Sequence, residues 1–232
     1  MKAAVYNTKL GAPEIIERAI PEIGDNEILL KPMSVGVCGS EVLTYRLTGP
    51  GSFGHEPAGI VERIGSNVKT LREGDRVFVH HRVPCMVCRY CRRGHPAMCA
   101  SYLEMGFDPS AYAEYTRVKA RNVQSDTILL PDHVSFDQGC LIEILSCIWR
   151  HLKRSNIYYG DTVMIVGAGF VGAVAVQIAK ILGAGKVFIS DFVDFKLEKA
   201  REVGADDVIN PGREDTLERV LQLNGGRKAD VV

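Results

Sequence analysis

Short apolar segments separated by Gly, Pro and Asn turns fill the chain up to about residue 125. Alternating apolar and polar positions over about 4–8 residues, bounded by turn-forming residues, are typical of strands. The pattern predicts strands at residues 2–6, 27–35, 59–64, 76–80 and 113–118. The first part of the chain is therefore expected to form an all-β, barrel-like domain.

The pattern becomes helical from about residue 136, and strands then alternate with helices from residue 161. Strands are expected at 162–166, 186–190, 207–209 and 229–232, with helices near 171–182, 195–203 and 216–223 between them. Such alternation predicts a parallel sheet with crossover helices. The chain is thus an α/β protein with two predicted domains, residues 1–150 and 151–232.

The fourth strand of the second domain has barely begun at residue 232. A doubly wound α/β domain uses about six strands in the order 3-2-1-4-5-6. Three to four strands supply only its first half and leave the first strand near an open edge. We therefore expect the sequence to hold a truncated domain of this type.

Charge and hydropathy exclude several classes of function. Lysine plus arginine and aspartate plus glutamate each total 28, and no block of like charge attracts a phosphate backbone. The apolar runs are too short to span a bilayer, and the N-terminus reads as a strand rather than a signal peptide. We expect a cytoplasmic protein without a nucleic-acid or membrane partner.

Four of the seven cysteines lie within one short segment, at Cys85, Cys88, Cys91 and Cys99. Two-residue gaps let neighbouring thiolates converge on one tetrahedral ion, and four thiolates close the site to water. This spacing predicts a structural zinc ion that holds together a segment too short to form its own core. Disulfides, unliganded thiols and an iron–sulfur cluster are the alternatives, and optical absorption would identify a cluster.

A glycine-rich turn follows the predicted strand 162–166 and opens a helix. In the segment GAGFVG, Gly167 permits the turn, Gly169 lets the backbone approach a pyrophosphate, and Gly172 allows close helix–strand packing. The helix N-terminus then faces negative charge. These three glycines with Phe170 and Val171 are the predicted cofactor-binding turn.

An acidic residue, Asp191, ends the next predicted strand, 19 residues after Gly172. A carboxylate there accepts hydrogen bonds from both adenosine ribose hydroxyls and repels a 2′-phosphate, so NAD is favoured over NADP. Lys196 is a second candidate near the adenosine, although it is equally consistent with a solvated helix lysine.

Cys38 and His55 are the remaining candidate ligands, and their residue types alone carry little signal. The run GHEPAGIVERIGSNV at 54–68, GDRV at 74–77 and VCGSE at 37–41 closely resemble the medium-chain zinc-dependent alcohol dehydrogenases. The four-cysteine segment matches the same family in the same order. The chain is most similar to the sorbitol and threonine dehydrogenase branch, which implies a GroES-like catalytic domain followed by a Rossmann domain.

The resemblance implies a catalytic zinc ion held by Cys38 and His55, with Glu56 and Glu143 trading places with water or substrate. Two zinc ions per chain, one catalytic and one structural, would then accompany NAD. Glu143 is alternatively a helix-surface carboxylate paired with Arg150. Ser40 is the family's proton-relay position, or else a simple turn hydroxyl.

Two features depart from the family pattern. Leu43 stands where many relatives have a histidine, which leaves the outer proton relay open, and Tyr45 is either its replacement or a packing residue. The segment between Cys38 and His55 is also shorter than in most relatives. His80 and His81 are interpreted as strand-end residues and not as metal ligands. Successive strand positions point to opposite faces, so the two side chains could not easily reach one ion.

These features predict hydride transfer from a secondary alcohol, a polyol or an amino alcohol to NAD. The expected partner is a small-molecule alcohol, and the resemblance implies a homodimer or homotetramer for the intact protein. The alternative is a catalytically silent zinc- and nucleotide-binding fragment without the nicotinamide half-site. Family members that reduce activated alkenes usually lack both zinc sites, so metal content separates them.

Overall fold

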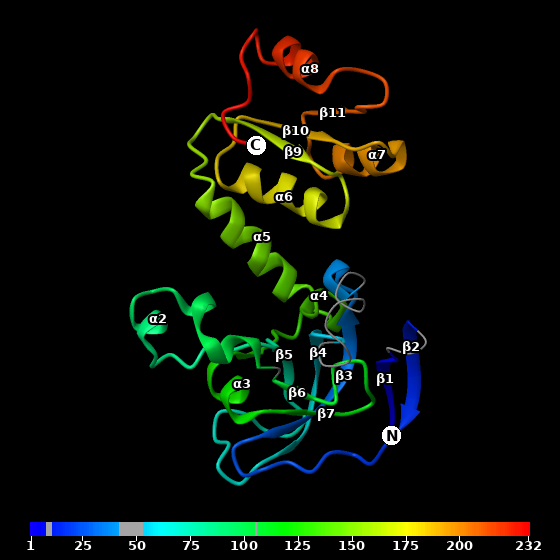
Figure 1. The fold of residues 1–232 in the computed structure, drawn as a ribbon, viewed down its shortest axis with the longest axis vertical. Coiled ribbons are helices and arrows are strands. Elements are labelled where there is room, and N and C mark those ends of the chain that lie inside the picture. Colours follow the sequence, from blue (N-terminus) through cyan, green and yellow to red (C-terminus); the bar gives the residue numbers. More distant parts are fainter. Residues whose placement is uncertain (8–10, 42–52, 105) are drawn as a thin grey trace. The chain divides into compact units, whose positions relative to one another are not determined.

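The computed structural model describes residues 1–7, 11–41, 53–104 and 106–232, and it divides into two compact units, Met1–Glu143 and Ile144–Val232 (Figure 1). The boundary expected at residue 150 falls inside helix α5 (Ile142–Arg154). Ile148 and Leu152 of this helix pack with Ala175 and Ile178 of the second unit. The helical pattern did not reveal which unit the helix joins, because that depends on the partner of its apolar face.

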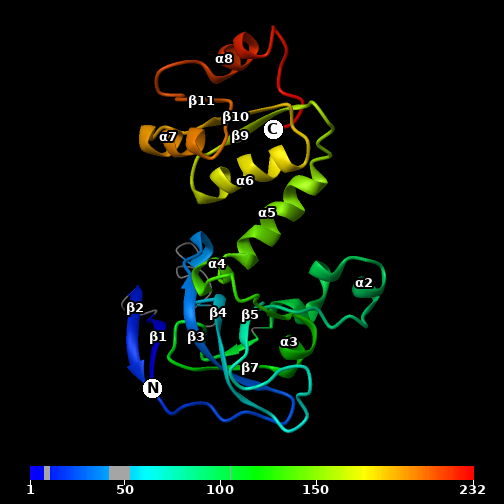
Figure 2. The same cartoon turned by 180° about the vertical axis from the view of Figure 1, so that it is seen from behind.

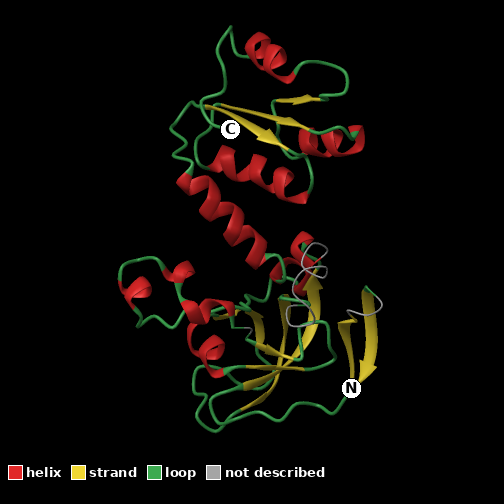
Figure 3. Ribbon diagram, viewed as in Figure 1, coloured by secondary structure: helices red, strands yellow, loops and turns green. Residues whose placement is uncertain are grey.

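A six-stranded antiparallel sheet forms the centre of the first unit (Figure 3). Its strands occur in the order β6 (Phe107–Asp108), β7 (Thr116–Val118), β3 (Ile28–Gly36), β4 (Glu56–Ile64), β5 (Arg76–Val79) and β8 (Thr127–Leu129). Buried apolar residues of these strands build the core, including Ile28, Leu30, Val61, Val77 and Val118. A separate hairpin pairs β1 (Lys2–Asn7) with β2 (Ala12–Glu17).

The pairing of β3 with β4 sets the position of the candidate metal ligands. Gly36, the last residue of β3, lies opposite Glu56, the first residue of β4. Cys38 therefore leaves the sheet at the edge where His55 enters it. Short helices complete the unit: α2 (Arg89–Arg92), η2 (Pro96–Met98), η3 (Ala100–Leu103), α3 (Ala120–Ser125) and α4 (Phe136–Gly139).

The second unit has a three-stranded parallel sheet, with its strands in the order β11 (Asp207–Ile209), β10 (Lys186–Ser190) and β9 (Thr162–Val166). Helices α6 (Phe170–Ile181), α7 (Asp194–Glu202) and α8 (Thr216–Leu223) connect or follow these strands, as both views of the ribbon show (Figure 2). The order is the first half, 3-2-1, of the expected doubly wound arrangement.

Several predicted elements differ from those observed. The expected strand 113–118 is limited to β7, with Ala113 forming only an isolated bridge to Ala3, and 229–232 contributes only a parallel bridge between Val231 and Val163. The sequence pattern missed β2, β6 and β8, whose short or exposed stretches lack clear alternation. Among the described residues, no helix has both the length and the apolar character needed to cross a membrane.

Candidate functional site

Cys38, His55 and Glu56 come together at the β3–β4 edge, with one ligand atom from each lying within 4.8 Å of the others. His55 Nε2 is 3.7 Å from Glu56 Oε1. Zinc bonds of 2.0–2.3 Å in tetrahedral geometry separate neighbouring ligand atoms by about 3.3–3.8 Å. The nitrogen and oxygen donors are already at this spacing, the Cys38 sulfur lies within 4.8 Å of both, and the three donor types are those that zinc prefers.

The burial of this group also fits a metal. His55 and Glu56 are 7% and 3% exposed, and Glu56 Oε1 has no hydrogen-bond partner within the described part of the chain. Burial raises the pKa of the Glu56 carboxyl and of the Cys38 thiol. A buried carboxylate oxygen without a partner is costly, and a cation would satisfy it.

Glu41 fixes the orientation of the His55 ring. Its Oε1 lies 3.1 Å from His55 Nδ1 and accepts a hydrogen bond from the Gly54 amide, while its Oε2 accepts one from the Tyr112 hydroxyl at 2.7 Å. Burial opposes a charge on His55, but the bond and the charge of Glu41, together with the charges of Glu56 and Glu143, outweigh it, so the pKa of His55 is raised. A carboxylate on one ring nitrogen leaves the other for a metal.

The site leaves no room for side chains at two neighbouring glycines. A Cβ on Gly36 would lie 2.0 Å from Glu56 Oε2, and one on Gly54 would lie 2.7 Å from the Tyr112 backbone nitrogen. Gly54 also has a φ of 75°, which favours glycine. Glycine at these two positions lets Glu56 and His55 face the same space.

Ser40 lies next to the candidate ligand thiol, and its hydroxyl donates to Cys38 Sγ at 3.2 Å. The side chain is exposed, so the hydroxyl can exchange protons with solvent. Leu43 and Tyr45, which bear on the outer proton relay, lie outside the described residues.

Glu143 groups with His80 and His81, and not with the three residues at the β3–β4 edge. Its charge nevertheless acts on the pKa values of both His55 and Glu56. Both histidines follow β5, which ends at Val79, as expected for strand-end residues. The expectation that they could not easily reach one ion is wrong, because a ring nitrogen of each lies within 4.8 Å of the other and of Glu143. Burial, with the neighbouring His55, His80 and Arg82, lowers the pKa of His81 to about 2.

The four cysteines of the segment 85–99, here called the cysteine lobe, place their sulfurs within 4.8 Å of one another. The amide of Cys88 donates to Cys85 Sγ, and that of Cys85 donates to Cys99 Sγ, both at 3.3 Å. Backbone donation, first from Val87, lowers the pKa of Cys85 to about 6, whereas burial raises that of Cys91 to about 12. All seven cysteines are described and none forms a disulfide. The lobe offers four sulfur donors to one tetrahedral ion.

The glycine-rich turn of the second unit has the geometry expected for phosphate binding. Gly167 has a φ of 99°, and Gly169 is the N-cap of α6 with open space where a Cβ would stand. A Cβ on Gly172 would lie 1.9 Å from the Gly167 carbonyl oxygen. The turn therefore needs glycine at its start and end, and it leaves the helix N-terminus accessible.

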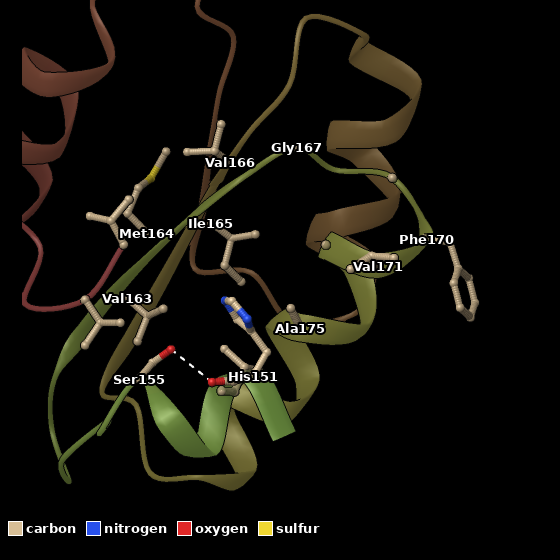
Figure 4. Close-up of a pocket in the computed structure, with 15 residues that line it drawn as sticks. His151, Ser155, Val163, Met164, Ile165, Val166, Gly167, Phe170, Val171 and Ala175 are labelled. Atoms are coloured by element: carbon tan, nitrogen blue, oxygen red, sulfur yellow. Dashed lines mark hydrogen bonds between the residues drawn. The ribbon is translucent and has the colours of Figure 1, made fainter. Parts of the chain in front are cut away.

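A pocket of about 510 Å³ adjoins this turn along β9 (Figure 4). Its lining is mostly apolar and includes Val163, Ile165, Val171 and Ala175. In the close-up the Phe170 ring projects outward from the turn, in agreement with its 52% exposure. The turn thus borders an open hollow, and Phe170 and Val171 are both accessible to a ligand.

Asp191 ties the end of β10 to the turn. One carboxylate oxygen accepts from the Ala168 amide and the other from the Val193 amide, both at 2.9 Å, and Lys196 Nζ is 3.7 Å away. Hydrogen bonds from these amides, Val193 first, lower the pKa of Asp191. Lys196 is therefore an ion-pair partner of Asp191 beside the glycine-rich turn.

Two alanine substitutions in the turn are expected to have different effects. Gly172→Ala should lower the free energy of unfolding by about 1–3 kcal/mol, because its Cβ overlaps the Gly167 carbonyl. Gly169→Ala should cost less than about 1 kcal/mol, the scale of a changed N-cap, yet it should weaken NADH binding by filling the phosphate space. Urea unfolding and NADH titration measure the two effects. Equal losses of stability in the two variants would contradict the packing role of Gly172 and the phosphate-binding role of Gly169.

Comparison with known proteins gives matches along most of the chain. A family model described as "Alcohol dehydrogenase GroES-like domain" matches residues 24–131, and one described as "Zinc-binding dehydrogenase" matches residues 171–232. The sorbitol dehydrogenase of Bacillus subtilis is 34% identical over 242 residues, which cover 100% of this chain and 67% of that protein.

Two other relatives give the same picture. The L-threonine 3-dehydrogenase of Caldanaerobacter subterraneus is 32% identical, over 100% of this chain and 68% of its own length. The solved structure of alcohol dehydrogenase TADH from Thermus sp. ATN1 superposes with a TM-score of 0.85 at 30% identity, covering 99% of this chain and 69% of that one. The chain therefore spans about two thirds of the length of these relatives.

Proposed function

Because the chain belongs to the medium-chain zinc-dependent alcohol dehydrogenase family, in the sorbitol and threonine dehydrogenase branch, we propose that its metal site and its dinucleotide turn serve one reaction. That reaction is the transfer of a hydride from a secondary alcohol, a polyol or an amino alcohol to NAD. The observation that carries the proposal is the buried Cys38–His55–Glu56 group, with its unsatisfied carboxylate oxygen and its Glu41-oriented histidine.

Each residue of the metal site has a defined task in this reaction. Cys38 and His55 hold the ion, while Glu56 and Glu143 are carboxylates that can give way to water or substrate. Zinc bound there supplies the acidification that lets an alcohol lose its proton near neutral pH. The Ser40 hydroxyl, beside Cys38 Sγ and exposed to solvent, takes this proton outward.

The dinucleotide turn binds the adenosine half of the cofactor. Gly167, Gly169 and Gly172 shape the turn so that the pyrophosphate meets the N-terminus of α6. Asp191 accepts hydrogen bonds from the ribose hydroxyls, and Lys196 lies close enough to contact the same ribose. Phe170 and Val171 contribute accessible backbone and side chain at the start of the helix.

Asp191→Ala is expected to reduce the preference for NADH over NADPH by about tenfold or more. The carboxylate is lost both as an acceptor for the ribose and as a repulsive charge, and about 1.4 kcal/mol changes a binding ratio tenfold. Titration calorimetry with both nucleotides measures the ratio. Glu198→Ala, an exposed acid on α7, is the matched control. An unchanged ratio of NADH to NADPH affinity in Asp191→Ala would show that other residues determine the choice between the two cofactors.

The proposal includes two zinc ions per chain, one in each site described above, and a homodimer or homotetramer as the assembled form. Metal analysis of the purified protein counts the ions, and light scattering after size-exclusion chromatography gives the mass of the assembly. One zinc per chain, or a monomer, would remove the corresponding part of the proposal.

The reaction itself is tested by oxidising a panel of polyols, threonine and simple secondary alcohols with NAD, followed by NADH absorbance. Turnover of at least one of these alcohols, lost on metal removal, is the expected result. Binding of zinc and NADH without turnover of any alcohol would favour the binding-only alternative.

A further inference from the structure

His80, His81 and Glu143 form a cluster with no assigned role, apart from Glu143, which the family resemblance lends to the catalytic ion. One ligand atom from each lies within 4.8 Å of the others. Two imidazoles and a carboxylate are a zinc donor set, and they equally suit Co²⁺ and Ni²⁺. The cluster therefore has the composition of a metal site without thiolate.

The Nδ1 atom of His81 is a buried group that lacks a partner. The residue is 9% exposed, and Nδ1 has no hydrogen-bond partner among the described residues. Its ring packs against His80, with centroids 5.0 Å apart, and against His55, with centroids 4.6 Å apart. A ring so enclosed is costly when a nitrogen stays unsatisfied, and a cation in the cluster would relieve that cost.

His80 lies beside a carboxylate and is held by its backbone. Asp126 Oδ2 is 2.9 Å from His80 Nδ1, although this buried nitrogen makes no hydrogen bond within the described part of the chain. The backbone is also fixed: the His80 amide donates to the Asp126 carbonyl, and the His80 carbonyl accepts from Asn122 Nδ2 at 2.7 Å. The Gly106 amide donates to the His81 carbonyl at 2.7 Å.

The charges around the cluster balance in favour of a cation. Asp126 and Glu143 are two carboxylates on or beside it, whereas Arg82 is the neighbouring positive group. Glu143 also acts electrostatically on His55 and Glu56, so its charge reaches both groups of ligands. A carboxylate has two oxygens, and one can serve an ion bound by His80 and His81 while the other faces an ion bound by Cys38 and His55.

We propose that His80, His81 and Glu143 form a third cation site, which binds a divalent transition metal beside the Cys38–His55–Glu56 site and shares Glu143 with it. The third site fills last, because it has three protein ligands and no thiolate. Counting bound ions needs no substrate, so the third site and the reaction proposed above are tested separately.

Native mass spectrometry of the full chain at rising zinc concentration tests the site. Wild type should reach three ions per chain, and His80→Gln should stop at two. Cys38→Ala should also stop at two, since the lobe and the third site remain. His133→Gln, an exposed histidine of the same unit, is the matched control and should keep three. Wild type that never exceeds two ions would overturn the proposal.

Asp126→Asn and cobalt spectroscopy give a second readout. Asp126→Asn should weaken the third ion by about 10–100-fold and leave the other two unchanged, as expected for a carboxylate beside His80 that does not itself bind the ion. The third equivalent of Co²⁺ should add d–d absorption without a thiolate charge-transfer band. A thiolate band on that equivalent, or equal weakening of all three ions, would refute the site.

Discussion

Replacing Cys38 with alanine should remove one zinc ion per chain and lower alcohol oxidation by at least about 10³-fold. A metal that moves the pKa of a bound oxygen by several units contributes several kcal/mol to the reaction, and each 1.4 kcal/mol is a factor of ten in rate. The remaining donors, His55 and Glu56, would lack the thiolate that anchors a borderline-soft ion. Zinc analysis and NADH production measure the two losses.

The matched control for this variant is Cys147→Ala, which removes a cysteine outside the candidate metal groups. It should keep the wild-type number of ions and full activity. The Cys38→Ala variant should retain the zinc ion of the cysteine lobe, and the lobe should unfold at the same temperature as in the wild type. A Cys38→Ala protein that oxidised the same alcohol at the wild-type rate would contradict the role of Cys38 as a ligand of the catalytic zinc ion.

Cys88→Ala should release the lobe zinc and unfold the segment 85–99. Metal binding by a structural site is itself folding free energy, worth about 10–16 kcal/mol in small zinc-binding peptides. Few buried side chains replace it here: Cys99 is buried, while Met86, Val87 and Met98 are 61%, 65% and 64% exposed. Hydrogen exchange within the lobe should rise to the unprotected rate, and the thermal midpoint should fall.

Removal of the ion from the wild-type lobe with a strong chelator should reproduce this result, and zinc should reverse it. The sheet of the first unit should keep its protection, because its core of Ile28, Leu30 and Val61 lies outside the lobe. A lobe that kept its exchange protection in Cys88→Ala would contradict the structural role. An iron–sulfur absorption spectrum would identify a different occupant.

Relatives of the chain confirm the predicted fold class, and the structure agrees with it in detail. The spacing of glycines and the strand before them predicted the turn at Gly167 and the parallel order of the second unit. The alternation of apolar residues located β3, β4 and β5 to within a few residues. Short exposed strands such as β8 were missed, because their pairing and not their pattern defines them.

The candidate metal site was less accessible to sequence reasoning. Cys38 and His55 were found through a resemblance, since His55 comes 17 positions after Cys38 and no local spacing rule joins them. Glu41 was missed as the partner of His55, and its only sequence signal is its place three residues after Cys38. Glu143 was expected beside Cys38, yet it groups with two histidines that had been interpreted as ordinary strand-end residues.

The sequence by itself determined the features whose parts are close along the chain: the cysteine lobe, the glycine-rich turn and the alternation of strands and helices. Their geometry is local, because a few backbone torsions fix the spacing of residues two or three apart. The tertiary structure alone decided the features built from distant segments. The β3–β4 register pairs Gly36 with Glu56 and so brings Cys38 near Glu56. A ring nitrogen of His80 and one of His81 lie near Glu143, and α5 packs against α6 of the second unit.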